Sequence, residues 1–222
     1  MKEALYWEKI SGAAVPAVHC LLCPHECKIA DGAEGICGAR QNNGGKLYSL
    51  IYGETTSVAL DPIEKKPLYH FHPGEYILSL GTKGCNFKCP FCQNWSISQD
   101  GGAPTEKITP SCAVAKAKEL GSFGIAYTYN EPFIWYEFVL DTAKLAKKSG
   151  LENVLVTNGF VNPGPLREML PLIGAMNIDL KSIDPGFYVK YCKGSLEPVL
   201  STIKTSAKSC HVEITNLVIT GL

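Results

Sequence analysis

From about residue 75 onward, short β-type runs alternate with longer helical runs, and this alternation constrains the fold more than any other feature. Repeated strand–helix units of this kind build a parallel sheet. Pro110 and Pro163 stand where helices begin, and Gly150 stands where one ends. The predicted strands are Tyr76–Gly81, Gly124–Tyr129, Asn153–Thr157, Met176–Leu180 and Val212–Ile219, and the predicted helices are Pro110–Leu120, Phe133–Ser149, Pro163–Ile173 and Pro198–Ser209.

The pattern divides the chain into two predicted parts. Residues 1–74 are loop-rich and Cys-rich, with a predicted strand pair formed by Lys46–Tyr52 and Thr55–Leu60, and we expect a small metal-binding subdomain there. Residues 75–222 are expected to form an α/β domain, a partial (β/α)6 barrel. Its five strands are one fewer than that barrel needs, and the chain stops soon after the fifth. Because an unpaired apolar edge such as Leu217–Ile219 promotes aggregation, the sequence favours a barrel truncated after strand five.

Composition excludes several classes of protein. Lys plus Arg equals Asp plus Glu at 21 each in 222 residues, so the formal net charge is zero and no basic stripe suits a nucleic acid. No apolar run is long enough to cross a bilayer, and the first residues lack the apolar core of a signal peptide. We therefore expect a cytoplasmic protein that binds neither nucleic acid nor a membrane.

The chain has ten cysteines, and most of them are grouped. Disulfides are disfavoured in a reducing compartment, so metal or cluster ligation is the expected use of grouped cysteines. Cys112, Cys192 and Cys210 are isolated and are expected to be small buried side chains. The two groups are Cys20, Cys23, Cys27 and Cys37, and then Cys85, Cys89 and Cys92.

The second group lies in Gly84–Cys92, here called the cluster loop, directly after the first predicted strand. Three thiolates spaced by three and then two residues can ligate three irons of a 4Fe–4S cluster and leave the fourth iron open, unlike a four-thiolate electron-transfer site. A zinc knuckle is the alternative, but zinc prefers four ligands, and the nearest candidate, His72, lies thirteen residues before Cys85.

An open iron suits S-adenosylmethionine (SAM), whose amino and carboxylate groups chelate it before reductive cleavage yields a 5′-deoxyadenosyl radical. Ligands in a parallel βα barrel bind at the carboxyl ends of the strands. Glu131 is placed there to accept hydrogen bonds from the SAM ammonium, and Asp179 and Lys181 share one strand face suited to a ribose hydroxyl and a carboxylate. Further polar candidates at strand ends are Thr157, Asn158, Glu213, Thr215 and Asn216.

Several segments carry a closer resemblance. The spacing CxxxCxxC resembles the signature of the radical SAM superfamily, and the wider segments resemble the AmmeMemoRadiSam-system radical SAM enzymes. Those enzymes are similar to the pyruvate formate-lyase activating enzymes, which install a glycyl radical on a partner protein. The segments that carry the resemblance are Asp61–Phe71, Gly84–Trp95, Ala126–Pro132 and Val156–Gly159.

The resemblance implies a partial (β/α)6 radical SAM barrel that binds SAM at the cluster. It implies that Asn130 and Glu131 lie near the methionyl amine, and that Asp179 and Lys181 match an Asp-Leu-Lys segment that contacts SAM. The Gly-Gly-Glu motif of the superfamily is here Tyr129-Asn130-Glu131, so only the glutamate matches. The members also continue past the fifth strand.

The N-terminal cysteine group, Cys20, Cys23, Cys27 and Cys37, can supply four thiolates to one metal. A closed tetrahedral zinc site would stabilise a segment too short to form its own core. An auxiliary iron–sulfur cluster that relays electrons is the alternative, since both accept four thiolates. His19 or His25 could also replace one cysteine.

Two functional hypotheses follow. The first is a radical SAM enzyme, an activating-enzyme-like oxidoreductase, that abstracts hydrogen from a glycyl-radical-type protein or another substrate. Such an enzyme also needs an electron donor, for example flavodoxin or ferredoxin. The second is an iron–sulfur or zinc protein for electron transfer or scaffolding, which would not cleave SAM and would ligate its cluster fully.

Overall fold

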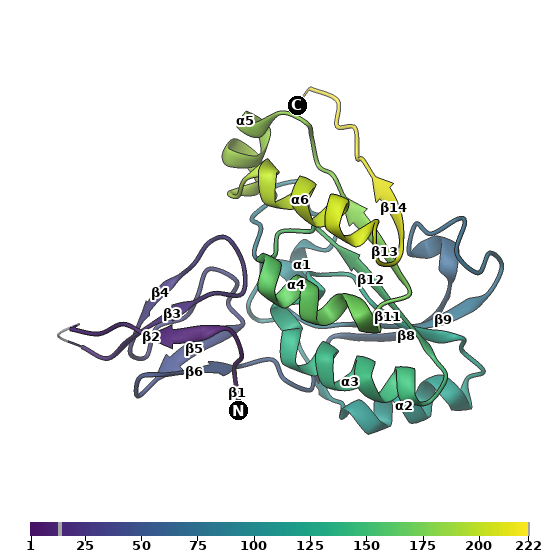
Figure 1. Ribbon diagram of the computed structural model, residues 1–222, viewed down its shortest axis with the longest axis horizontal. Helices are drawn as coiled ribbons and strands as arrows, with labels where there is room; N and C mark the ends of the chain where they lie inside the picture. The colour runs from purple at the N-terminus through teal and green to yellow at the C-terminus, as the bar shows by residue number, and fades with distance from the viewer. Residues whose placement is uncertain (13–14, 222) are drawn as a thin grey trace.

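The computed structural model describes residues 1–12 and 15–221 and is organised around one six-stranded sheet (Figure 1). Five of its strands are parallel neighbours, and β8 pairs antiparallel with β9 at one edge. In spatial order the strands are β14 (His211–Thr215), β13 (Ala175–Asp179), β12 (Glu152–Thr157), β11 (Gly124–Tyr127), β9 (Tyr76–Gly81) and β8 (Ser57–Pro62). The expected α/β architecture with a parallel sheet is therefore confirmed.

The predicted parallel strands match the observed ones within two residues, except at the end of β14. That strand was expected to continue to Ile219 but ends at Thr215. Its neighbour β13 ends at Asp179, which pairs with Thr215, so the ladder between these two strands ends there in the described part of the chain.

Helices cover the face of the sheet that carries the larger core. Apolar side chains of the helices pack there against Leu80, Tyr127, Leu155 and Ile178 of the strands. The helix predicted from residue 133 begins as a separate 3-10 turn (Pro132–Trp135), because Glu131 caps it through the Phe133 N–H. The main helices are α2 (Pro110–Glu119), α3 (Tyr136–Lys148), α4 (Pro163–Met169) and α6 (Leu196–Ser206), and the short ones are α1 (Trp95–Ser98), α5 (Pro185–Phe187), the 3-10 turns Ile63–Lys65 and Leu170–Leu172, and the π-helical turn Tyr188–Cys192.

Residues before β8, together with β10, form small antiparallel sheets beside the main sheet (Figure 1). One has the order β1–β6–β5, one has the order β2–β3–β4, and β7 pairs with β10. The bounds are β1 (Lys2–Glu3), β2 (Trp7–Lys9), β3 (Ala17–Cys20), β4 (Lys28–Ala30), β5 (Arg40–Asn43), β6 (Lys46–Ser49), β7 (Glu54–Thr55) and β10 (Glu106–Lys107).

The predicted pairing of Lys46–Tyr52 with Thr55–Leu60 is wrong. β6 pairs instead with β5 and β1, while residues 57–62 form β8 and pair along the whole of β9. The reason is that β8 leads directly into Ile63 and Leu68, which are fully buried against the inner face of the main sheet. The main sheet thus begins before residue 75, and a separate subdomain at 1–74 stays a prediction.

Residues 63–74, here called the inner segment, cross the other face of the sheet and cover it. Ile63 and Leu68 pack with Ile77, Ala126 and Val154 in a second core. The far end of the segment is held by β14, where the Glu213 carboxylate accepts hydrogen bonds from the N–H groups of Tyr69 (3.0 Å) and His70 (2.9 Å).

No helix among the described residues is long and apolar enough to cross a membrane.

This contact makes the stability of the fold depend on pH. Burial raises the pKa of Glu213, but hydrogen bonds from the Tyr69 N–H, the His211 ring and the His70 N–H outweigh it and lower the pKa from 4.5 to about 2. The carboxylate therefore stabilises the fold above pH 4.5, and this contribution is lost as the pH falls toward 2. We expect Glu213→Gln to lower the free energy of unfolding at pH 7 by about 1.5–3 kcal/mol, the value of hydrogen bonds to a charged group.

Urea denaturation at pH 7 and at pH 3 measures this difference. The loss of unfolding free energy in Glu213→Gln should be smaller at pH 3 than at pH 7. The exposed control Glu119→Gln should change the free energy of unfolding by less than about 0.5 kcal/mol. A deficit that does not vary with pH would contradict the role assigned to this carboxylate.

Candidate functional site

The three cysteines of the cluster loop follow β9 at its carboxyl end. Cys89 is buried, and Cys85 and Cys92 are half-buried. Hydrogen-bond donors face two of the sulfurs, because the Phe87 N–H lies 3.4 Å from the Cys85 Sγ and the Ser98 Oγ lies 3.1 Å from the Cys92 Sγ. Donors of this kind stabilise thiolate ligands.

The chemistry of this donor set fits an iron–sulfur cluster. Burial raises the pKa of Cys85, and a hydrogen bond with Cys192 followed by burial raises that of Cys89, so these thiols stay protonated until a cation binds. Among residues 1–12 and 15–221, no three Cys, His, Asp or Glu side chains converge closely enough to hold one metal ion. The ligand roles of Cys85, Cys89 and Cys92 therefore stay a prediction, supported by their place and their donors.

Asn130 fastens the start of the cluster loop. Its Oδ1 accepts a hydrogen bond from the Thr82 N–H (3.1 Å), and its Nδ2 donates to the Gly84 carbonyl (2.9 Å). Just after the loop, the Asn94 Nδ2 donates to the Tyr129 carbonyl (2.7 Å). Two consecutive residues at the end of β11 thus hold both ends of the loop. The expected position of Asn130 near the methionyl amine stays a prediction, and its amide also hydrogen-bonds the loop backbone.

Tyr129 adopts a backbone conformation that favours glycine, with φ of 74°. Its side chain is anchored beneath the site, because its hydroxyl donates to Asp61 Oδ2 (2.6 Å) and the Lys66 ammonium lies 4.5 Å from its ring centroid. Lys66 is 1% exposed and also donates to Asp61 Oδ2 (2.8 Å). This buried ion pair helps to hold Tyr129 in a backbone conformation that residues other than glycine seldom adopt.

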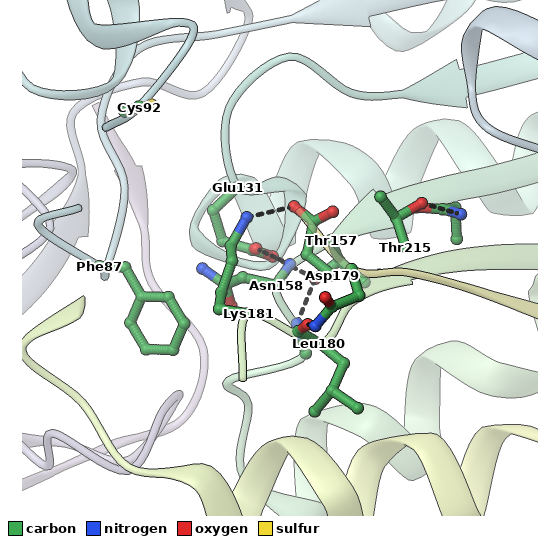
Figure 2. A network of polar contacts seen from close by, with 12 residues as sticks. Phe87, Cys92, Glu131, Thr157, Asn158, Asp179, Leu180, Lys181 and Thr215 are labelled. Atoms are coloured by element: carbon green, nitrogen blue, oxygen red, sulfur yellow. Dashed lines mark hydrogen bonds and ion pairs between the residues drawn. The ribbon is translucent and has the colours of Figure 1, made fainter. Parts of the chain in front are cut away.

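Glu131 lies buried at the centre of the site (Figure 2). One carboxylate oxygen accepts from the Phe133 N–H (2.9 Å) and the Thr157 hydroxyl (2.8 Å), and the other accepts from the Asn158 N–H (2.8 Å). Burial raises the pKa of Glu131 to about 7, although these donors oppose the shift. Asn158 also links this carboxylate to the cluster loop, since its Nδ2 lies 3.7 Å from the Cys85 Sγ.

Asp179 and Lys181 complete the polar cluster, as Figure 2 shows. The Lys181 Nζ lies 2.6 Å from the Asp179 Oδ2. Burial lowers the pKa of Lys181, but the charge of Asp179 outweighs this and raises it, with smaller contributions from Cys89 and Cys85. The Asp179 charge also raises the pKa of Glu131, so the three charged groups and the cluster loop act on one another.

The structure brings most of the predicted SAM-binding and cluster residues together, while the N-terminal cysteines line a separate cavity. Glu213 lies away from the cluster loop, with the Tyr69 and His70 backbone. Cys112, expected to be buried, is exposed, since it lies in the first turn of α2 outside the helix's buried stripe. The residues gathered at the carboxyl ends of β9, β11, β12 and β13 are Cys85, Cys89, Cys92, Asn130, Glu131, Thr157, Asn158, Asp179 and Lys181.

Sequence reasoning missed three contributors. Asn86 of the cluster loop is buried, donates to the Phe160 carbonyl (2.8 Å) and accepts from Asn158 (2.8 Å). The Asp61–Lys66 pair supports Tyr129 from β8, and the thiol of Cys192 lies within hydrogen-bond reach of Cys89. Only the position of Asn86 between the first two loop cysteines offered a signal, because the other contacts arise from folding.

Comparison with known proteins gives consistent results. A model described as the radical SAM superfamily matches residues 79–222. The chain is 45% identical over 222 residues to an uncharacterised protein of Methanocaldococcus jannaschii, which covers 99% of this chain and 65% of that protein. It is 24% identical over 110 residues to the pyruvate formate-lyase-activating enzyme of Clostridium pasteurianum, which covers 48% of this chain and 46% of that enzyme. The chain thus spans less than two thirds of either relative.

A solved structure shares the fold. SuiB of Streptococcus suis superposes with a TM-score of 0.50 at 12% identity, over 64% of this chain and 32% of SuiB. At this identity the likeness concerns the arrangement of strands and helices alone. The predicted likeness to the radical SAM superfamily and to activating enzymes is confirmed by these matches taken together.

The contacts of Asn130 lead to a testable expectation. Asn130→Ala removes two hydrogen bonds, so it should lower the free energy of unfolding by about 1–3 kcal/mol and reduce the iron that the reconstituted chain retains. The matched control is Asn177→Ala, whose amide donates to the Pro67 carbonyl (2.9 Å) and the Thr215 hydroxyl (3.0 Å) on the inner face.

Denaturation curves measure the loss of stability in both variants, and iron analysis measures the iron that each reconstituted variant retains. The control should lose stability but keep its iron. Equal iron retention in Asn130→Ala and Asn177→Ala would contradict the assigned role of Asn130.

Proposed function

Because the chain belongs to the radical SAM superfamily, whose model matches residues 79–222, we propose that it is an enzyme that cleaves SAM reductively and abstracts hydrogen from a substrate. The observation that carries this proposal is the position of the three-cysteine loop beside Glu131 and the Asp179–Lys181 pair. A 4Fe–4S cluster held by Cys85, Cys89 and Cys92 would supply the electron that converts SAM to methionine and a 5′-deoxyadenosyl radical.

The charged residues suit the polar groups of SAM. The oxygen of Glu131 that accepts from the Asn158 N–H has a lone pair left for an N–H of the methionyl amine. Thr157 and Asn158 hold that carboxylate in place, and they act on SAM through it. Lys181 is suited to the SAM carboxylate and Asp179 to a ribose hydroxyl, since the two share an ion pair at the carboxyl end of β13.

The substrate and the partners are proposed more broadly. The similarity to an activating enzyme over 48% of the chain supports a protein glycine as one substrate class, and a small molecule or peptide is the alternative. An electron donor such as flavodoxin or ferredoxin would reduce the cluster. A cytoplasmic location and a Cys-rich N-terminal subdomain with zinc or a second iron–sulfur cluster stay predictions.

One observation favours the second candidate function, an electron-transfer or scaffold protein. Cys192 is fully buried, and its thiol lies within hydrogen-bond reach of Cys89. A fourth thiolate at this position would close the cluster and leave no open iron. The two functions therefore differ in what Cys192 does.

Anaerobic reconstitution followed by reduction in the presence of SAM tests the proposed activity. We expect 5′-deoxyadenosine and methionine as products, no products from Cys89→Ala, and full iron content and products from Cys192→Ser. A cluster that is lost in Cys192→Ser, together with an unmodified chain that forms no 5′-deoxyadenosine, would favour the electron-transfer function instead.

The pKa of Glu131 predicts how SAM binding depends on pH. With a pKa of about 7, Glu131 becomes ionised as the pH rises through 7. The neutral acid carries a proton on one oxygen, so only the ionised form can accept hydrogen bonds from N–H donors freely on both oxygens. SAM affinity should therefore increase between pH 6 and pH 8, by up to about tenfold per unit below the pKa.

Equilibrium binding of SAM to the reconstituted chain measures this dependence. Glu131→Gln should bind more weakly and lack this step, and the difference between the two proteins removes the titration of SAM itself. The same pH profile in both would contradict a contact between Glu131 and SAM.

A further inference from the structure

The four cysteines of the N-terminal group line one cavity outside the matched superfamily region, although in the described structure they do not converge closely enough to coordinate one ion. Cys20 ends β3, Cys23 and Cys27 lie between β3 and β4, and Cys37 lies shortly before β5. All four line the same cavity of about 10 Å³. That volume is close to a single water-sized sphere, so it suits one ion rather than a four-iron cluster.

One of the four sulfurs has a charged hydrogen-bond donor. The Arg40 Nη1 lies 3.7 Å from the Cys20 Sγ. A neutral thiol is only a weak acceptor, whereas a metal-bound thiolate is a strong one. The position of Arg40 therefore suits a metal-bound thiolate at Cys20.

The charges around the cavity agree with this. Arg40 is 1% exposed and forms an ion pair with Glu137, which is equally buried. Within the described chain, the Arg40 Nε and the Glu137 Oε2 are buried without a hydrogen-bond partner. Four thiolates around one divalent ion carry a net charge of minus two, and a permanently charged guanidinium at their edge offsets part of it. Four neutral thiols would give the buried arginine no such role.

We propose that Cys20, Cys23, Cys27 and Cys37 together hold one structural zinc ion, with Arg40 as the hydrogen-bonding cation beside Cys20. Zinc accepts four thiolates in a closed tetrahedral site and needs no redox partner. This deepens the N-terminal metal site of the proposed function by choosing between zinc and an auxiliary cluster.

The site also supports the cluster loop. The His25 ring, two residues after Cys23, lies with its Nε2 2.7 Å from the Asn86 carbonyl. Gly84 lies so close to the Cys37 carbonyl that a Cβ at this position would be 2.6 Å from it. A zinc ion that fixes Cys23 and Cys37 therefore fixes two contacts of the loop that carries Cys85.

Metal analysis of a full-length variant without the loop cysteines tests the zinc assignment. In the triple variant Cys85→Ala, Cys89→Ala and Cys92→Ala, we expect one zinc per chain, no iron and no acid-labile sulfide. The zinc X-ray absorption spectrum should show four sulfur neighbours at about 2.3 Å. Iron with sulfide in this variant, or no bound metal, would overturn the assignment.

Substitutions in the N-terminal group complete the test. Adding Cys23→Ser or Cys37→Ser to the triple variant should abolish the bound zinc, whereas the half-buried control Cys210→Ser should retain it. In a chain with intact loop cysteines, Cys23→Ser should also retain less iron than Cys210→Ser, and equal iron would overturn the supporting role. Retention of zinc in Cys23→Ser would overturn the site itself.

A measurement on the unmodified chain avoids variants that fail to fold. A mercurial reagent titrates thiols and releases zinc that they bind, and a colorimetric chelator follows the release. We expect one zinc per chain to be released as thiols react, and no release would overturn the proposal. Zinc content does not depend on SAM cleavage, so the failure of either proposal is distinguishable from the failure of the other.

Discussion

Hydrogen bonds from asparagine side chains to the backbone hold the cluster loop, and the arrangement of the whole site depends on them. The loop has no regular ladder, so its buried N–H and C=O groups need partners from elsewhere. Asn130 supplies two at the start of the loop, and Asn94 ties its end to Tyr129. Inside the loop, Asn86 is fixed by Phe160 and Asn158. The cysteines are thus positioned by β11 and β12 rather than by the loop itself.

Glu131 connects this loop to the strand ends electrostatically. A buried carboxylate is energetically costly unless its oxygens are hydrogen-bonded. The oxygens of Glu131 accept from three donors, the Phe133 N–H, the Thr157 hydroxyl and the Asn158 N–H. The Asp179–Lys181 pair belongs to the same polar cluster, because the Asp179 charge raises the pKa of Glu131 (Figure 2). The Glu131 carboxylate and the Asp179–Lys181 ion pair offer charges of both signs, so the site suits a zwitterionic ligand better than a purely apolar one.

Four strands of the parallel sheet, β9, β11, β12 and β13, could be predicted from the sequence because each is a short, mostly buried run between turn residues. β14 is only partly buried, and its end was predicted wrongly. The pairing of β8 could not be predicted, although a strand was expected at Thr55–Leu60, since its register with β9 depends on the burial of Ile63 and Leu68 beneath the sheet. The three loop cysteines could be singled out by spacing alone. Glu213 shows the limit of that reasoning: a polar side chain on the inner face of a strand can serve the backbone of a distant segment.

Other parts of the site depend on contacts that no spacing reveals. The position of Asn130 beside SAM stays a prediction, and the spacing did not reveal that its amide also hydrogen-bonds the loop entrance. Lys66 and Asp61 meet Tyr129 across more than sixty residues of sequence. The apposition of Cys192 and Cys89 arises because the π-helical turn Tyr188–Cys192 packs on the loop, where the Cys192 carbonyl accepts from the Lys88 N–H (2.9 Å). Such contacts depend on the complete fold.

The central claim is that one iron of a cluster held by Cys85, Cys89 and Cys92 is open to SAM. Pulsed electron–nuclear double resonance on the reduced, reconstituted chain with SAM labelled with ¹⁵N at its amino group tests this most directly. The account predicts a ¹⁵N hyperfine coupling to the cluster that persists in Cys192→Ser. A reduced cluster with no ¹⁵N coupling at saturating SAM would contradict it.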